Sequence, residues 1–256
     1  MSFTIENLEF FLMILVRISG FMFAAPIFGQ KGVPARVKVG LSFFLAVIVT
    51  GLVPYEPLAY EGTLGFAVLA VQETLIGLIL GYVANICTMI LEFSGRIVDT
   101  EIGFSMVTAL NPTSNIQTTI TGNMYTYMVL LVLLITDMYY YIVKAVIDCF
   151  QVIPPGQGVI DKSLYSVMKI FMSDYFVIGF RIIVPVFACM LVVNVVLGVL
   201  AKVAPQMNMF VIGVQLKVVV GICILFFTIS MLPTISDYIF EEMKMLLNAA
   251  VEVMKP

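Results

Sequence analysis

Histidine and tryptophan are absent from the 256-residue sequence, and charged residues are scarce at 11%. A soluble domain usually carries about 25% charged residues, so this composition excludes an ordinary soluble domain. Hydrophobic residues make up 61% of the chain, which favours an integral membrane protein. The net charge of −3 leaves no excess of basic residues to form a patch, so nucleic acid is not an expected partner.

Motifs for metal, redox or hydrolytic chemistry are also missing. The cysteines stand singly, without a CxxC spacing, at Cys87, Cys149, Cys189 and Cys223. The sequence has no Walker A, GxSxG or HExxH motif. Asp99 and Glu101 lie two positions apart, on different faces of a helix, and we expect them to be solvated or paired with Arg96. The sequence thus predicts no metal, no cofactor and no enzymatic activity.

Long apolar segments are what the chain has in place of these motifs. They cover about 8–28, 38–54, 64–91, 123–147, 175–200 and 209–232. A membrane-spanning helix needs roughly 20 apolar residues, and most of these segments are long enough. They do not alternate between apolar and polar residues as barrel strands do. We therefore predict an all-α, membrane-type protein with about six long, kinked helices.

Two further helices are predicted to be amphipathic. Residues 161–175, DKSLYSVMKIFMSDY, place apolar side chains on one face, which predicts a short helix lying at a membrane interface. The last 20 or so residues form a second amphipathic pattern with acidic residues near its start.

Basic residues in the short loops predict the orientation of the spans. The first loop carries Lys31, Arg36 and Lys38, whereas the second carries Glu56 and Glu61. This difference puts the first loop in the cytoplasm and the N-terminus outside. With six spans, the C-terminus is predicted to lie outside as well.

Ionisable side chains interrupt the apolar segments, and each would cost about 2.5–3.5 kcal/mol if it faced lipid at the centre of a span. One hypothesis is a proton or ion relay; the alternative is pairing between helices or subunits, or snorkelling near a helix end. These residues are Arg17, Glu73, Asp137, Arg181 and Lys217.

Residues that break or closely pack helices are also prominent. Gly77 and Gly81 form a GxxxG pattern, which permits close helix approach. The predicted helix breaks and turns are at Pro26, Pro34, Pro185, Pro205, Asn208 and Gly213.

Residues 103–119, GFSMVTALNPTSNIQTT, form a polar, uncharged segment near the middle of the chain. Composition alone makes this segment a polar loop between the third and fourth spans, and the predicted orientation of the spans puts it on the cytoplasmic side.

The order of these features along the whole chain resembles the FliR family of flagellar type III export-gate proteins, and after it their injectisome counterparts. The stretches that carry the resemblance are VRISGFMFAAPIFG, GVPARVKVGLSF, QETLIGLILGY, SGRIVDTEIGFSMVTALNP and GVLAKVAPQMNMFVIGVQLKVVVG. One departure is Gln215, where such proteins often have proline.

The resemblance implies a FliP-like part over 1–174 and a FliQ-like helical hairpin with a C-terminal amphipathic helix over 175–256. It further implies a hetero-oligomeric helical gate with FliP-like and FliQ-like subunits, and FlhB and FlhA as further partners. Such a gate conducts unfolded export substrates. Its expected place is the bacterial inner membrane, in contact with lipid, at the flagellar basal body. Buried charges such as Arg17, Glu73 and Lys217 would then meet neighbouring subunits.

In a pore-forming assembly, residues 103–119 gain a second interpretation. A closed pore needs a seal that deforms, and flexible methionine and uncharged polar side chains suit that task. We expect residues 104–115 to project into the pore as a plug, with Met106 at or near the narrowest point of the pore. The predicted plug residues are Phe104, Met106, Val107, Leu110, Asn111 and Pro112. A plain loop is the alternative for this segment.

For the whole chain the alternative function is a secondary transporter with a relay through Glu73, Asp137 and Arg181.

Overall fold

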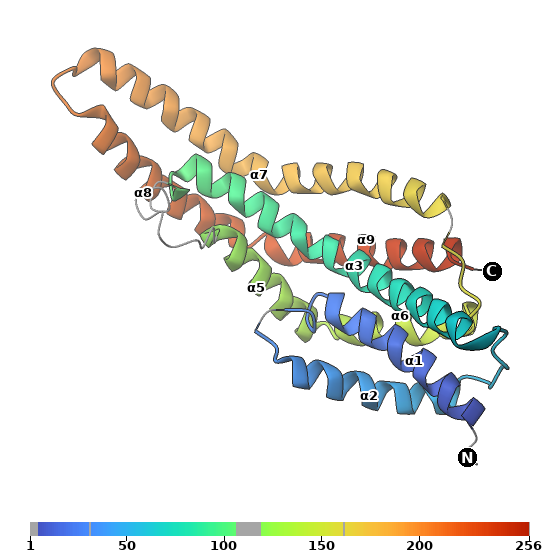
Figure 1. Cartoon of the computed structure of the whole chain (residues 1–256). Coiled ribbons are helices and arrows are strands. Elements are labelled where there is room, and N and C mark those ends of the chain that lie inside the picture. Colours follow the sequence, from blue (N-terminus) through green and yellow to red (C-terminus); the bar gives the residue numbers. More distant parts are fainter. Residues whose placement is uncertain (1–4, 31, 106–118, 161, 256) are drawn as a thin grey trace. The chain divides into compact units, whose positions relative to one another are not determined.

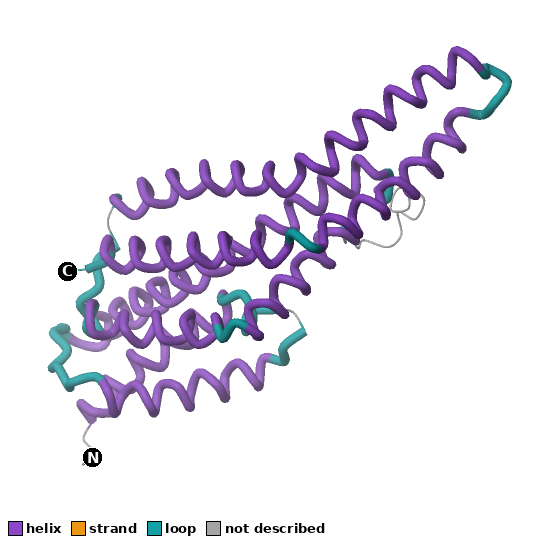
Figure 2. The backbone as a smooth tube through the Cα atoms, turned by 180° about the vertical axis from the view of Figure 1, so that it is seen from behind, coloured by secondary structure: helices purple, strands orange, loops and turns teal. Residues whose placement is uncertain are grey.

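The computed structural model describes residues 5–30, 32–105, 119–160 and 162–255 (Figure 1). These residues form long helices joined by short loops and contain no strand, which confirms the all-α prediction (Figure 2). The helices are α1 (Ile5–Ala24), α2 (Ala35–Leu52), α3 (Gly62–Ile102), α5 (Ile120–Ile135), α6 (Met138–Val152), α7 (Ser163–Val203), α8 (Met209–Ile229) and α9 (Leu232–Val253).

Length and composition make α1, α2, α3, α7 and α8 candidates to cross a membrane within the described part of the chain. A sixth span results if α5 and α6 are counted together. Helix α9 begins with Pro233 in its first turn, where the missing N–H costs no hydrogen bond. Its buried residues recur every three or four positions, as they should in the predicted amphipathic C-terminal helix.

Two predicted segments differ in continuity from the helices of the structure. The segment 123–147 is not one straight helix, because Asp137 adopts a left-handed backbone with φ 55° and the chain bends by 75° between α5 and α6. Aspartate is one of the few non-glycine residues that adopt this conformation readily. The expected short helix at 161–175 is instead the first part of the continuous α7, since residues 163–174 contain neither glycine nor proline to stop it.

The chain divides into two compact units, and α3, α5, α7 and α9 each pass from one to the other. The first contains the described parts of Met1–Cys87, Leu134–Met172 and Phe240–Pro256. The second contains those of Thr88–Leu133 and Ser173–Ile239. This division follows packing within one chain, and the FliP-like and FliQ-like division at residue 174 stays a prediction.

Backbone contact between α1 and α3 organises the first unit. A Cβ added to Gly77 would overlap the carbonyl oxygen of Arg17, and one on Gly81 would lie 2.6 Å from the carbonyl oxygen of Phe21. From the α1 side, a Cβ on Gly20 would lie 2.7 Å from the carbonyl oxygen of Thr74. The GxxxG pattern therefore serves a helix crossing within the chain.

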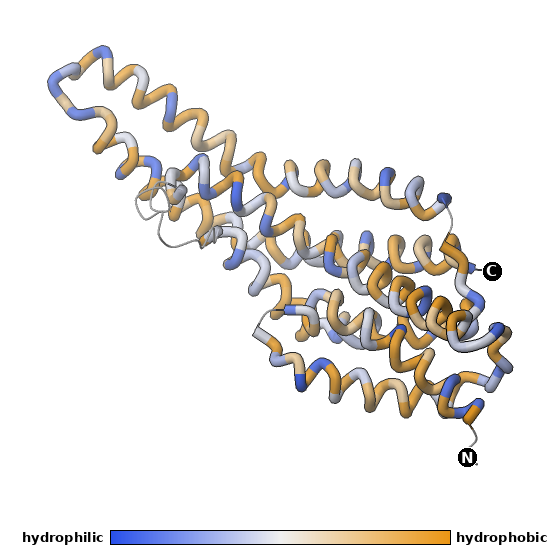
Figure 3. The backbone as a smooth tube through the Cα atoms, in the orientation of Figure 1, coloured by the Kyte–Doolittle hydropathy of each residue, from blue (hydrophilic) through white to orange (hydrophobic). Residues whose placement is uncertain are grey.

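A second glycine contact and an antiparallel hairpin organise the second unit. Gly95 of α3 meets the backbone of Gly122 of α5 so closely that neither position has room for a side chain. Helices α7 and α8 lie side by side and are joined by a short turn at residues 204–208 (Figures 1 and 2). The Asn208 side chain caps α8 by accepting a hydrogen bond from the Phe210 N–H at 3.2 Å. Figure 3 shows that this hairpin is hydrophobic over most of its length.

Candidate functional site

The most completely bonded polar site in the described residues joins Arg17 of α1 to Glu73 of α3. Arg17 Nε lies 2.5 Å from Glu73 Oε2, and Arg17 Nη2 donates to Glu73 Oε1 at 2.9 Å. Both side chains are completely buried. The paired contacts match the planar fork of a guanidinium against a carboxylate, which fixes the orientation of both groups.

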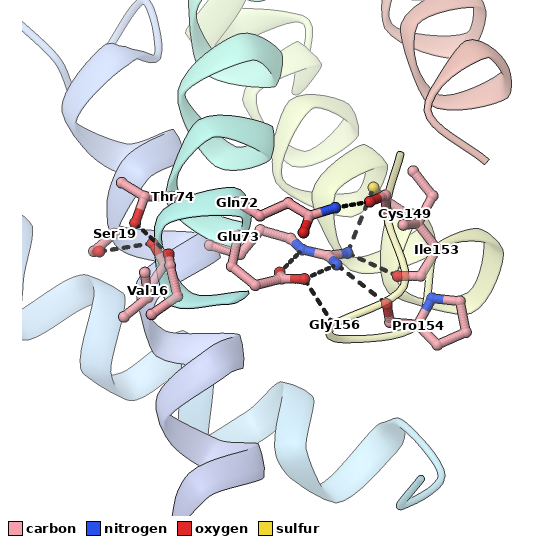
Figure 4. Close-up of polar contacts among 12 residues, drawn as sticks. Val16, Ser19, Gln72, Glu73, Thr74, Cys149, Ile153, Pro154 and Gly156 are labelled. Carbon is pink, nitrogen blue, oxygen red and sulfur yellow. Dashed lines mark hydrogen bonds and ion pairs between the residues drawn. The ribbon is translucent and has the colours of Figure 1, made fainter. Parts of the chain in front are cut away.

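The same two side chains hold the loop that follows α6. Arg17 Nη1 donates to the carbonyl oxygen of Ile153 at 2.8 Å, and Nη2 donates to that of Pro154 at 3.4 Å. Glu73 Oε1 accepts a hydrogen bond from the Gly156 N–H at 2.8 Å. Figure 4 shows these loop groups converging on the carboxylate and the guanidinium. The ion pair thus fastens α1, α3 and the loop together.

Neighbouring contacts complete this cluster. Gln72 donates to the carbonyl oxygen of Gly158, further along the same loop. The guanidinium carbon of Arg17 lies 4.4 Å from the centre of the Phe150 ring, and Nη1 also approaches Cys149 Sγ at 3.9 Å. Every charged group of the cluster therefore has partners on the protein, as a buried ion pair requires.

This geometry favours pairing over a proton relay. Arginine does not release its proton in proteins, so the partner of Glu73 cannot pass a proton on. Both carboxylate oxygens of Glu73 are already occupied by Arg17 and the Gly156 N–H. Arg17 and Glu73 thus satisfy each other within the chain and need no charge from a neighbouring subunit.

The remaining predicted charges do not join this cluster. Asp137 is exposed at the bend between α5 and α6. Arg181 is exposed on α7, with its guanidinium carbon 5.7 Å from the Tyr238 ring centre. Lys217 is half-buried on α8. None of these three forms an ion pair with another described residue.

The predicted helix breaks fall into two groups. Pro185 lies inside α7, which continues through it, and Gly213 lies within α8, buried against Leu197. The others lie at helix ends: Pro26 in the turn after α1, Pro34 at the start of α2, and Pro205 and Asn208 between α7 and α8.

Most of the predicted plug lies outside the described residues. Phe104 is described and half-buried. Met106, Val107, Leu110, Asn111 and Pro112 belong to the part of the chain, 106–118, that the structure does not describe.

The two described ends of that segment are joined by Asp99. Helix α3 ends before Gly103, whose φ of +96° suits glycine. The Asp99 carboxylate accepts hydrogen bonds from the N–H groups of Ile120 at 2.7 Å and Thr121 at 3.0 Å. It therefore caps the start of α5 and places both ends of the segment beside each other. We call Asp99, Gly103, Ile120 and Thr121 the stem.

Sequence reasoning missed this role of Asp99, which is 5% exposed and therefore not solvated as expected. Arg96 does not pair with it, because Arg96 contacts Glu92 one turn earlier at 3.3 Å. Thr119 stands where a cap of α5 would be expected, but its buried hydroxyl has no hydrogen-bond partner among the described residues. The acceptor for α5 comes from 21 residues earlier, and only the packing of α5 on α3 reveals it.

Comparison with known proteins gives one consistent result. The model of the family described as bacterial export proteins, family 1, matches residues 8–243. A flagellar biosynthetic protein FliR from Bacillus subtilis is 31% identical over 245 residues, which cover 94% of each chain. Its namesake in Escherichia coli is 26% identical over 229 residues, 89% of this chain and 87% of the other. The Aquifex aeolicus protein of that name is 25% identical over 237 residues, 91% of this chain and 92% of the other.

Proposed function

The chain belongs to family 1 of the bacterial export proteins, and on that premise we propose that it lines and plugs the pore of the flagellar type III export gate. The observation that carries this proposal is the match of the family over residues 8–243, almost the whole chain. The chain is a membrane-type helical component of the flagellar export apparatus, and its place is the inner membrane at the flagellar basal body. Its role there is structural, and we propose no catalytic step for it.

Partner subunits would cover the hairpin of α7 and α8. In their most apolar stretches, only 28% of α7 and 17% of α8 are buried, against 61% of α3. Lipid or other helices must therefore cover the remainder. We propose that FliP-like and FliQ-like subunits cover these faces in a helical assembly, with FlhB and FlhA as further partners. Unfolded export substrates would pass through its pore.

The stem supports the plug hypothesis. Because Asp99 holds the start of α5 beside the end of α3, the segment between them begins and ends at one place. A segment tethered in this way can occupy a pore and move aside without separating the helices that carry it. Its lack of charge avoids strong binding of passing chains.

Deleting residues 106–118 tests the plug. We expect ion conductance through membranes containing the assembled gate to rise, because the seal is removed while the stem remains. Met106→Ala should give a smaller leak, and Met89→Ala, at an exposed position of α3, serves as the matched control. Co-purification of the subunits shows that assembly survives. Unchanged conductance in an assembled deletion variant would make the segment a plain loop.

Orientation is part of the proposal. We propose that both termini lie outside, because Lys31, Arg36 and Lys38 mark the first loop as cytoplasmic. The test starts from a chain whose four native cysteines are replaced by alanine, because Cys189 and Cys223 are exposed. A single cysteine is then introduced at residue 6 or residue 255 and labelled with an impermeant reagent in intact spheroplasts. Labelling only after lysis would show that the termini lie in the cytoplasm and would contradict the proposed orientation.

A further inference from the structure

Helices α3, α6 and α9 of the first unit enclose an open cavity of about 240 Å³ that takes no part in the proposed gating. Its floor is apolar and its rim is polar. The floor residues include Leu80, Val146, Cys149, Val152, Leu247 and Val251. The polar rim consists of Tyr141, Lys144, Asp148, Asn248 and Glu252.

The rim charges are arranged by sign along the cavity. Lys144 and Asp148 lie one turn apart on α6, and Asn248 and Glu252 lie one turn apart on α9. The helices run in the same direction (Figure 1), and Lys244 of α9 lies 5.2 Å from the ring centre of Tyr141 of α6. In this register, Asp148 and Glu252 come to the same level near the C-terminal helix ends, and the lysines lie toward the other end.

The three rim charges are available for a ligand. Lys144, Asp148 and Glu252 are exposed, and none forms an ion pair with another described residue. Glu252 lies in the last turn of α9 and Asp148 one turn before the end of α6, where the helix dipoles add negative potential. One end of the cavity therefore attracts a cation, and the end with Lys144 attracts an anion.

We propose that this cavity binds the head group of an amine-bearing zwitterionic phospholipid. The ammonium group lies between Asp148 and Glu252, the phosphate lies at Lys144, and an acyl chain covers the apolar floor. Four residues span about 6 Å along a helix, which is the scale of a phosphate and an ammonium joined by two carbons.

The character of the two helices favours lipid over a protein partner. Both α6 and α9 are amphipathic, and such helices lie at the level of lipid head groups. A basic peptide would match the two carboxylates, but it would be repelled by Lys144 and Lys244. A zwitterionic head group satisfies both signs at once.

Native mass spectrometry of the full chain, released from membranes with its partners, tests this proposal. The probes are phosphatidylethanolamine and phosphatidylglycerol with identical acyl chains. We expect about a fivefold preference for the amine-bearing lipid, the scale of one exposed charge contact. Asp148→Asn with Glu252→Gln should remove the preference, and Lys144→Gln should weaken binding of both lipids.

The matched control is Asp237→Asn with Glu241→Gln, which removes two carboxylates from exposed positions of α9 outside the cavity. It should leave the lipid preference unchanged. Equal binding of both lipids to the unmodified chain would overturn the proposal, as would the same preference in the Asp148/Glu252 variant. Displacement of the lipid by a lysine-rich peptide, with the same sensitivity to Asp148 and Glu252, would assign the cavity to a protein instead.

Discussion

Arg17 or Glu73 alone would be costly to bury in an apolar helix, and the two can be buried only as a pair. Burying a single charge leaves it without water, whereas the pair and its loop contacts satisfy both groups. The pair also joins residues that are 56 positions apart in the chain. Its effect at the residue scale is to fix which face of α1 meets α3.

Replacing either partner should therefore destabilise the protein more than replacing both. Arg17→Met or Glu73→Met leaves one uncompensated buried charge, which costs about 3–5 kcal/mol. The double variant should recover part of this loss, although Ile153 and Gly156 then lack partners, at about 1 kcal/mol each. The measurement is to heat membranes that contain each variant and then digest the unfolded protein with protease. The fraction that resists digestion ranks the single and double variants by stability. Additive losses in the double variant would contradict direct pairing.

Tyr60, in the loop between α2 and α3, gives a pH-dependent prediction. Its hydroxyl donates to Glu9 Oε2 at 2.8 Å, and this hydrogen bond together with the negative charge raises the pKa of the phenol. The raised pKa favours neutral Tyr60 in the folded chain. Its contribution to stability is thus complete below the ordinary tyrosine pKa of about 10 and is lost as the pH rises through the folded value.

Glu9→Gln should lower the Tyr60 pKa toward that of an ordinary tyrosine. The measurement is the phenolate absorbance during alkaline titration, as the difference between each chain and its Tyr60→Phe counterpart. If Tyr60 titrates identically in the unmodified chain and in the Glu9→Gln variant, the hydrogen bond to Glu9 is not the cause of the raised pKa.

At the scale of helices, glycine positions decide which pairs approach closely. Gly77 and Gly81 allow α3 to meet α1, and Gly95 allows it to meet α5. A glycine in a helix otherwise costs about 0.5–1 kcal/mol relative to alanine. These residues are therefore explained by the backbone contact that they allow.

Gly77→Ala should destabilise the protein by about 1–3 kcal/mol, because the new methyl group overlaps the Arg17 carbonyl and forces α1 and α3 apart. Gly40→Ala in α2 is the matched control, since nothing lies within 4 Å of its added Cβ. That variant should be neutral or slightly more stable. The same heating and proteolysis assay compares them, and equal stabilities would exclude a tight α1–α3 crossing.

At the scale of the whole molecule, the chain exposes far more apolar surface than a soluble monomer does. Large apolar side chains such as Phe226 and Phe227 are more than 70% exposed on α8. Membrane lipid covers some of this surface, and the proposed FliP-like and FliQ-like subunits cover the rest.

Purification of the chain alone should therefore yield heterogeneous aggregates, whereas co-expression with FliP-like and FliQ-like proteins should yield one species. Size-exclusion chromatography in detergent measures the difference. A monodisperse single chain that binds a small solute would instead support the secondary transporter.

The pattern of residues predicted the helical class, most helix positions and the family, because apolar length and helix breakers are local properties. It also singled out Arg17, Glu73 and the GxxxG pair as residues in need of partners. It did not predict the bend at Asp137, since an aspartate in an apolar segment is equally compatible with a buried charge. It also missed the cap formed by Asp99, because the capped helix begins 21 residues later.

The sequence by itself determined that this protein is a helical membrane component of bacterial export, because composition and motif order can be read without knowing any tertiary contact. The tertiary structure decided which of its polar residues are satisfied. It paired Arg17 with Glu73, assigned Asp99 to the start of α5 and left Lys144, Asp148 and Glu252 around an open cavity. The physical reason is that the energy of a charge depends on its partners and solvent, and those are set by helices that are distant in sequence.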